Sequence, residues 1–126
     1  MNYPNDIRYT KEHEWLRDNG DGTATVGITD FAQGELGDIV FVELNDEGME
    51  LEQDDSFGTV EAVKTVSDLY APVAGSIAEI NAELEEHPEL VNDDPYGKGW
   101  MIKMKVKDAG DIQKLMSSED YQDIVA

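Results

Sequence analysis

Lys64, near the middle of the chain, has the setting best suited to chemistry. It stands between two runs of strand-forming residues, 57–62 and 65–71, and these runs predict a hairpin with Val63 and Lys64 at its turn. A hairpin tip displays its lysine to partner molecules. Lysine is also common at hairpin tips because it stays solvated and discourages pairing between strand edges. The local residue types leave both interpretations open.

The rest of the chain offers little for catalysis. It contains no cysteine, which excludes disulfides, zinc–thiolate sites and thiol catalysis. Neither of its two histidines, His13 and His87, has a second histidine four residues further on, so no zinc site is predicted. The sequence also lacks a nucleophile elbow, a Walker loop and a dinucleotide fingerprint. We therefore expect a protein that is not an enzyme by itself and holds no metal.

Length and charge restrict the possible partners. The 126 residues predict a single domain, 1–126, with an ordered core over about 7–125. The formal net charge of −20 argues against nucleic acid and against anionic membranes, and suggests a saline setting. There is no apolar run of about 18 residues and no export or transit signal, so a cytoplasmic, monomeric protein is expected.

Short strands separated by glycine-rich turns predict a mainly β protein. Strands are expected at 23–28, 38–44, 49–51, 57–62, 65–71, 75–80 and 99–106, with a turn at 18–22 and a loop at 92–97. Helical segments are expected at 31–36 after a cap at Thr29 or Asp30, at 82–86 after Asn81, after Asp108, and at 118–125 after Ser117. In the last of these, Tyr121, Ile124 and Val125 are expected to share a face. This pattern indicates a small sandwich or barrel with a C-terminal helix.

The hairpin segment, residues 60–75, resembles the lipoyl-attachment segment of the H protein of the glycine cleavage system. Further blocks resemble the same family in the same order, at 9–15, 26–33, 36–44, 89–92, 94–97 and 99–103. The resemblance extends over about residues 7–125. It implies a lipoyl/biotinyl-type fold, a hybrid of barrel and sandwich made of two small antiparallel sheets, with short helices and a C-terminal helix.

The resemblance also implies a function. Lys64 would carry lipoate through an amide bond (as N6-lipoyllysine), and the arm would visit three enzymes in turn. These are the pyridoxal-phosphate-dependent glycine decarboxylase (P protein), the tetrahydrofolate-dependent aminomethyltransferase (T protein) and dihydrolipoamide dehydrogenase (L protein). The chain would be a carrier for the aminomethyl group of glycine, and a lipoylating enzyme would be a further partner.

Other positions match the family's pattern one by one. Glu61, three residues before the lysine, and Gly75, eleven after it, fit the pattern for recognition by the lipoylating enzyme. Glu14 and Asp68 match positions near a cleft that receives the loaded arm, where they would bind the cationic aminomethyl group. The alternative is that they are solvated acids on an acidic surface. Family members can carry a histidine near position 35, where this chain has Glu35.

Two other functions use the same lysine. One is an H-type scaffold from which lipoyl or octanoyl groups are relayed to other enzymes, and residue types do not separate it from the glycine cleavage role. The other is a lipoyl domain of a 2-oxoacid dehydrogenase, which the C-terminal helical segments and the lack of a Pro/Ala-rich linker disfavour.

Overall fold

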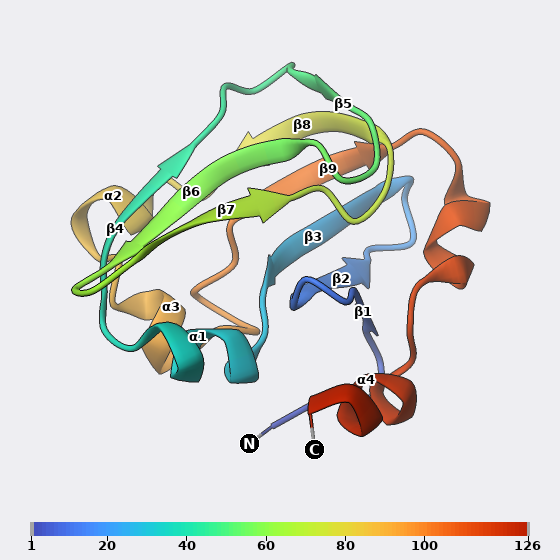
Figure 1. Ribbon diagram of the computed structural model, residues 1–126. Helices are drawn as coiled ribbons and strands as arrows, with labels where there is room; N and C mark the ends of the chain where they lie inside the picture. The colour runs from blue at the N-terminus through green and yellow to red at the C-terminus, as the bar shows by residue number, and fades with distance from the viewer. Residues whose placement is uncertain (1, 126) are drawn as a thin grey trace.

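The computed structural model describes residues 2–125, and two antiparallel sheets make up most of it (Figure 1). The larger sheet has the spatial order β1-β2-β3-β9-β8-β5. Its strands are β1 (Arg8–Tyr9), β2 (Glu14–Asp18), β3 (Thr23–Ile28), β5 (Glu50–Leu51), β8 (Gly75–Ile80) and β9 (Ile102–Val106). The smaller sheet has the order β4-β6-β7, with β4 (Ile39–Leu44), β6 (Ser56–Ala62) and β7 (Val66–Tyr70). The mainly β fold is confirmed, and the sheets form a sandwich rather than a closed barrel.

Short helices connect the strands and cover the edges. They are α1 (Asp30–Leu36), α2 (Glu83–Glu86), α3 (Leu90–Asp93), the 3₁₀ helix η1 (Ala109–Lys114) and α4 (Ser118–Val125). Three of the predicted caps are present. Thr29 accepts a hydrogen bond from the Ala32 amide, Asp108 from the Gly110 amide and Ser117 from the Asp120 amide. α1, η1 and α4 therefore begin where a polar side chain accepts a hydrogen bond from a free amide.

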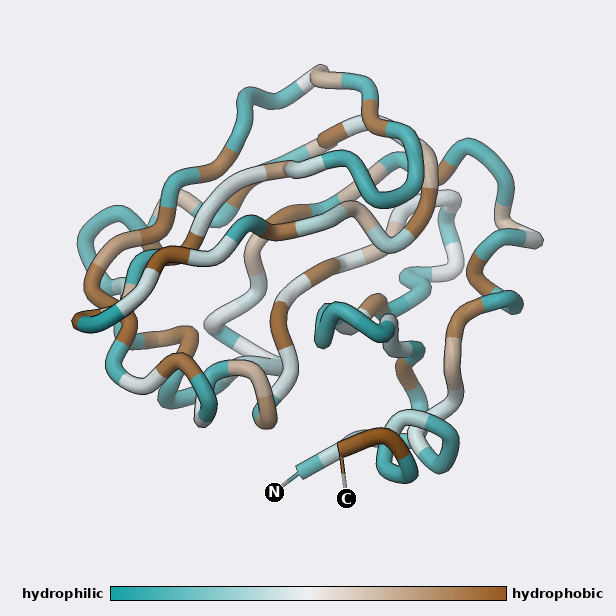
Figure 2. The backbone as a smooth tube through the Cα atoms, in the orientation of Figure 1, coloured by the Kyte–Doolittle hydropathy of each residue, from teal (hydrophilic) through white to brown (hydrophobic). Residues whose placement is uncertain are grey.

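The main core lies between the two sheets. The smaller sheet contributes Val42, Val60 and Leu69, and the larger sheet contributes residues such as Val26 and Met104, all buried. Figure 2 shows the hydrophobic positions along the strands and the hydrophilic ones along the connecting loops. Alternation of side chains across each strand explains this pattern, because one face of each sheet is turned to the other sheet.

A second, aromatic cluster attaches the C-terminal helix to the larger sheet. Tyr9, Trp15, Tyr96 and Tyr121 are its aromatic members, and all four are buried. Tyr121 of α4 stacks on Tyr9 of β1, with ring centroids 4.7 Å apart and planes 7° from parallel. This contact joins residues that are far apart in sequence and fixes α4 beside β1 and β2 (Figure 1).

Three details differ from the expectations. The strand expected at 99–106 begins at Ile102, because the preceding segment is a turn in which the Trp100 amide bonds to the Gly97 carbonyl. The loop expected at 92–97 begins inside α3. Of the three residues expected to share a face of α4, Tyr121 is buried and Val125 packs against the same aromatic cluster, whereas Ile124 is 51 % exposed. The first and last residues of the expected domain, 1–126, lie outside the described residues.

The β6–β7 hairpin forms as predicted. Glu61 pairs with Val66, and the ladder continues as the Ala62 amide bonds to the Thr65 carbonyl at 2.8 Å. Val63 and Lys64 therefore form the tip. In Figure 1 this tip projects from the sandwich beside the start of β4. Of the helices in residues 2–125, none is long and apolar enough to cross a membrane.

Gly75 is placed where a side chain does not fit. It begins β8 and pairs with Val106 of β9, and a Cβ at this position would lie 2.3 Å from the Lys105 carbonyl oxygen. We expect Gly75→Ala to lower the free energy of unfolding by about 2 kcal/mol or more, because the backbone of β8 must move away from β9. Urea denaturation measures this, with Ser76→Ala on the same strand as a control. Equal stability of both variants would contradict the close approach.

Candidate functional site

Lys64 is exposed at the hairpin tip, between two exposed apolar side chains. Val63 is 71 % exposed and Val66 is 60 % exposed. None of the ion pairs found among residues 2–125 involves Lys64. Two antiparallel strands hold the tip in place, while the lysine side chain itself extends into solvent. This arrangement offers a primary amine to any enzyme that can cover the tip.

Glu61 lies close to the lysine on the outer face of the smaller sheet. It pairs with Phe41 on one side and with Val66 on the other, and all three side chains are exposed. The row therefore presents one carboxylate between two apolar groups, a few residues from Lys64. A partner that binds the tip will meet this row.

A cleft of about 360 Å³ lies next to the hairpin, between β6–β7, α1 and the turn that leads into β2. Its lining residues are Glu12, His13, Glu14, Ile28, Phe31, Ala32, Glu35, Leu36, Val60, Ser67, Asp68 and Leu69. Val60 and Ser67 face each other in the β6–β7 ladder. This pair is three ladder steps from the Val63–Lys64 tip, which is roughly 10 Å at a rise of about 3.3 Å per residue. A lysine side chain extended by an acyl group can span a distance of this order.

Glu14 is the buried carboxylate of the cleft. It is 2 % exposed, and its Oε1 accepts a hydrogen bond from the Thr10 hydroxyl at 2.7 Å. Its Oε2 accepts one from the Tyr70 amide of β7 at 3.3 Å. Burial raises the pKa of Glu14 to about 8, although these hydrogen bonds oppose the shift. The side chain is thus poised to change its charge near neutral pH.

Asp68 is at the rim of the same cleft. Unlike Glu14 it is exposed, because it alternates along β7 with Ser67 and Leu69, which face inwards. The structure therefore brings the two predicted cleft carboxylates to one cavity, at different depths.

Several lining residues were not predicted as members of the cleft. Glu12 and Glu35 add two further carboxylates, so the cleft has four acidic side chains and no lysine or arginine among its lining residues. Glu35 stands where a histidine would be expected from the family, and it makes the cleft more acidic. The described residues contain no group of three or more acidic or histidine side chains arranged to hold a metal ion. The cleft is suited to an organic cation on an apolar arm, because Phe31, Leu36 and other apolar groups also line it.

His13 is a further lining residue, and no pattern of residue types singles it out. Its backbone has φ = 70°, which is unusual for a residue with a side chain. Its ring lies 4.9 Å from that of Phe31, and its Nδ1 is 2.7 Å from the Tyr121 hydroxyl. Burial lowers the pKa of His13, which favours the neutral imidazole.

Gly75 is not near the lysine. It begins β8 after β7 has run its full length away from the tip, so it lies towards the opposite end of the hairpin (Figure 1). The structural requirement for glycine is the contact with the β9 backbone described above. Glu61 and Gly75 are therefore separated, and only Glu61 adjoins Lys64.

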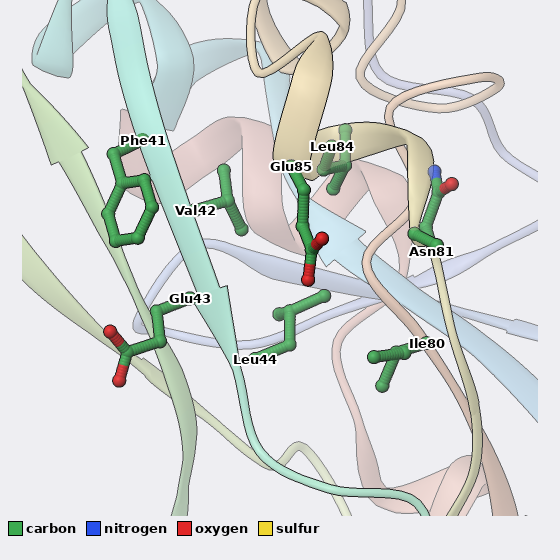
Figure 3. A pocket seen from close by; sticks show the side chains of 9 residues that line it. Phe41, Val42, Glu43, Leu44, Ile80, Asn81, Leu84 and Glu85 are labelled. Carbon is green, nitrogen blue, oxygen red and sulfur yellow. The ribbon is translucent and has the colours of Figure 1, made fainter.

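A second hollow, between β4 and α2, is less suited to this role (Figure 3). It measures about 230 Å³. Leu44, Ile80 and Leu84 gather in it, Glu85 points towards Leu44, and Glu43 points away. It lacks a buried carboxylate comparable to Glu14, so the cleft beside α1 is the better candidate for binding a cation.

Known proteins similar to this chain agree on one family. Residues 7–126 match the family described as Glycine cleavage H-protein. The glycine cleavage system H protein of Salinibacter ruber is 60 % identical over 124 residues, covering 98 % of this chain and 99 % of its own. That of Bacteroides fragilis is 57 % identical over 125 residues, covering 99 % and 98 %. The crystal structure of the H protein of Mycobacterium marinum superposes with a TM-score of 0.88 at 37 % identity, covering 97 % of this chain and 98 % of that one.

The buried Glu14 predicts a pH dependence of stability. Its pKa is about 8 in the folded protein against an ordinary value of 4.5, so the folded state keeps a proton that the unfolded chain releases. The protonated carboxyl group therefore stabilises the folded state. This contribution to the free energy of unfolding is complete below about pH 4.5 and is lost as the pH rises through about 8. Between about pH 5 and pH 8, we expect the free energy of unfolding to fall on the order of 3 kcal/mol further in wild type than in Glu14→Gln.

Chemical denaturation at several pH values measures this difference. Glu43→Gln, which neutralises an exposed carboxylate of β4, serves as the control for the change in net charge and should retain the wild-type slope. Parallel pH profiles of wild type and Glu14→Gln would show that the carboxyl group ionises normally in the folded protein.

Proposed function

The chain belongs to the glycine cleavage H-protein family, and we propose that Lys64 is the residue that carries its lipoyl group. The protein is a lipoyl carrier of the glycine cleavage system, and members of its family hold lipoate covalently on a lysine. Among the lysines, Lys64 is supported by one observation above all. It is exposed at the tip of a well-paired hairpin, next to a cleft large enough to receive part of an attached arm.

The residues present fit a lipoyl group. The amine of Lys64 is accessible for amide formation, and the cleft combines apolar walls with carboxylates. The bound group supplies the sulfur chemistry that carries the aminomethyl group of glycine, and the chain contains no cysteine that could exchange with that sulfur. A tether at Lys64 keeps the arm at high local concentration beside the cleft.

We propose that the acidic cleft holds the loaded arm between visits to partners. Glu14 and Asp68 bind the cationic aminomethyl group, one from the interior and one from the rim. A cation next to Glu14 favours its ionised form, so entry of the loaded arm is accompanied by release of a proton from this carboxyl group. The apolar walls limit access of water to the carried group.

The partners follow from membership of the glycine cleavage system. We propose that the arm receives the aminomethyl group at the P protein, delivers it at the T protein and is reoxidised at the L protein, while the chain itself contributes no catalytic group. Glu61 adjoins Lys64 and is well placed for recognition by the lipoylating enzyme. Gly75 would contribute to this recognition only indirectly, because it allows β8 to pair closely with β9. We propose that residues 1–126 act as one carrier domain.

Relay of lipoyl groups to other enzymes remains the second candidate, because it would use the same lysine and the same hairpin. The lipoyl domain of a 2-oxoacid dehydrogenase is disfavoured, since the family match and the relatives extend over nearly the whole chain. Transfer of label from lipoylated protein to an acceptor lipoyl domain, without glycine, would support the relay.

Intact-mass measurement of protein from its native host tests the attachment site. We expect one lipoyl increment in the wild type and in Lys107→Arg, which alters another exposed lysine, and none in Lys64→Arg. The substitution retains the positive charge but removes the amine that forms the amide. An increment that persists in Lys64→Arg would assign the group to another lysine.

Release of the aminomethyl group from the loaded protein tests the cleft. We expect Glu14→Gln to shorten the half-life about tenfold, because a charged hydrogen bond in a buried site is worth roughly 1.5–3 kcal/mol. Asp68→Asn should have a smaller effect, since this carboxylate is exposed. Glu43→Gln, on the outer face of the smaller sheet, should release the group at the wild-type rate. Identical half-lives in all four proteins would remove the cleft from the proposal.

A further inference from the structure

One hydroxyl group lies between two of the segments that form the walls of the cleft, the turn that leads into β2 and α1. It belongs to Tyr121 of α4, and it is 2.7 Å from His13 Nδ1 and 2.7 Å from Thr29 Oγ1. His13 lines the cleft, and Thr29 is the cap of α1. Tyr121 is fully buried behind these residues and is not a lining residue itself. A residue of the C-terminal helix thus contacts both walls from outside the cavity.

The first wall is the turn that leads into β2. His13 has a left-handed backbone conformation, and two hydrogen bonds hold it, from its amide to the Thr10 carbonyl and from the Thr29 amide to its carbonyl. Such a conformation persists only where its surroundings enforce it. Glu14 is the next residue in the chain. The backbone conformation of His13 therefore also sets the position from which the buried Glu14 side chain extends.

The second wall is α1, which contributes Phe31, Ala32, Glu35 and Leu36 to the cleft. Its first turn depends on Thr29, whose hydroxyl oxygen accepts a hydrogen bond from the Ala32 amide at 3.2 Å. The position of α1 relative to the His13 turn is therefore linked to the hydrogen bond between Thr29 and Tyr121.

The donors and acceptors define a direction for this network. Among the described residues, Thr29 Oγ1 bonds to the Ala32 amide, which is a donor, and to the Tyr121 oxygen, so the Tyr121 oxygen is the acceptor available to the proton of the buried threonine hydroxyl. The tyrosine proton is then donated to His13 Nδ1. A neutral His13 must carry its own proton on Nε2, the nitrogen on the other side of the ring from Tyr121. The chain of hydrogen bonds thus selects one tautomer of the cleft histidine.

We propose that Tyr121 is a positioning residue for the arm cleft, whose hydroxyl joins the His13 turn to α1 and holds His13 as the Nε2–H tautomer. The inference rests on the proposed role of the cleft and extends it to the C-terminal helix. The Nε2–H donor of His13 and the backbone of its turn are then ordered before the loaded arm enters the cleft. Entry of the arm therefore carries no cost for ordering them. The aromatic stacking of Tyr121 on Tyr9 supplies the support that keeps the hydroxyl in place.

Tyr121→Phe tests the proposal, because it retains the buried ring and removes the hydroxyl. The first measurement is nitrogen-15 NMR of the His13 imidazole in unmodified protein. We expect mainly the Nε2–H tautomer in wild type and a substantial Nδ1–H population in Tyr121→Phe. Thr29→Ser, which retains a hydroxyl at the cap, should resemble wild type. A wild-type His13 that carries its proton on Nδ1 would overturn the network, even if Tyr121→Phe did not fold.

The second measurement is release of the aminomethyl group from the loaded protein. We expect Tyr121→Phe to shorten the half-life about fivefold, which corresponds to loss of one neutral hydrogen bond of about 1 kcal/mol. Tyr9→Phe is the matched control, because it removes a tyrosine hydroxyl of the same aromatic cluster that bonds to the Pro4 carbonyl at 2.6 Å and has no link to the cleft. Its half-life should equal that of wild type.

The two measurements separate two kinds of failure. An altered tautomer with an unchanged half-life in Tyr121→Phe, while Glu14→Gln is still impaired, would show that positioning by Tyr121 is unimportant for the arm. Unchanged half-lives in both variants would instead contradict the proposed role of the cleft. Equal shortening in Tyr9→Phe and Tyr121→Phe would assign the effect to general loss of stability.

Discussion

The buried carboxylate of Glu14 connects the two sheets beside the cleft. A carboxyl group removed from water must find hydrogen-bond donors, and Glu14 finds one in the Thr10 hydroxyl and one in the Tyr70 amide. The second donor belongs to β7 of the smaller sheet, whereas Glu14 itself begins β2 of the larger sheet. The β6–β7 hairpin is thereby fixed beside the cleft, and Lys64 is held within reach of it. Placing a group that titrates near neutral pH at this junction makes the cleft sensitive to the charge of what enters it.

The protein divides rigidity and mobility between its parts. Strand pairing fixes the hairpin up to Ala62 and Thr65, and the side chain of Lys64 extends from its tip into solvent. The cleft is likewise supported from behind by aromatic packing that extends to α4. This division suits a lipoyl carrier, because a rigid body leaves only the attached arm to be ordered when a partner binds.

Much of this arrangement could be predicted from residue types. The β6–β7 hairpin, its two-residue tip and the caps at Thr29, Asp108 and Ser117 depend on neighbours in the sequence, and local physics is sufficient for them. The start of β9 at Ile102 and the exposure of Ile124 were missed, because turns and partner surfaces elsewhere in the fold decide them. The family resemblance supplied Glu14 and Asp68, but no local pattern distinguished their depths.

The sequence alone determined the position of the hairpin lysine and the resemblance of the chain to one family. The absence of cysteine and of enzyme motifs, the lysine between two strand-forming runs and the family blocks all follow from residue identity and spacing. Only the tertiary structure decided which acids form the cleft, that Gly75 lies away from the lysine, and that Tyr121 contacts His13 across 108 positions of sequence. The reason is that burial and hydrogen bonding between distant segments arise from packing of the two sheets and α4. Such packing shifts the pKa of Glu14 and leaves other carboxylates of the same chain in solvent.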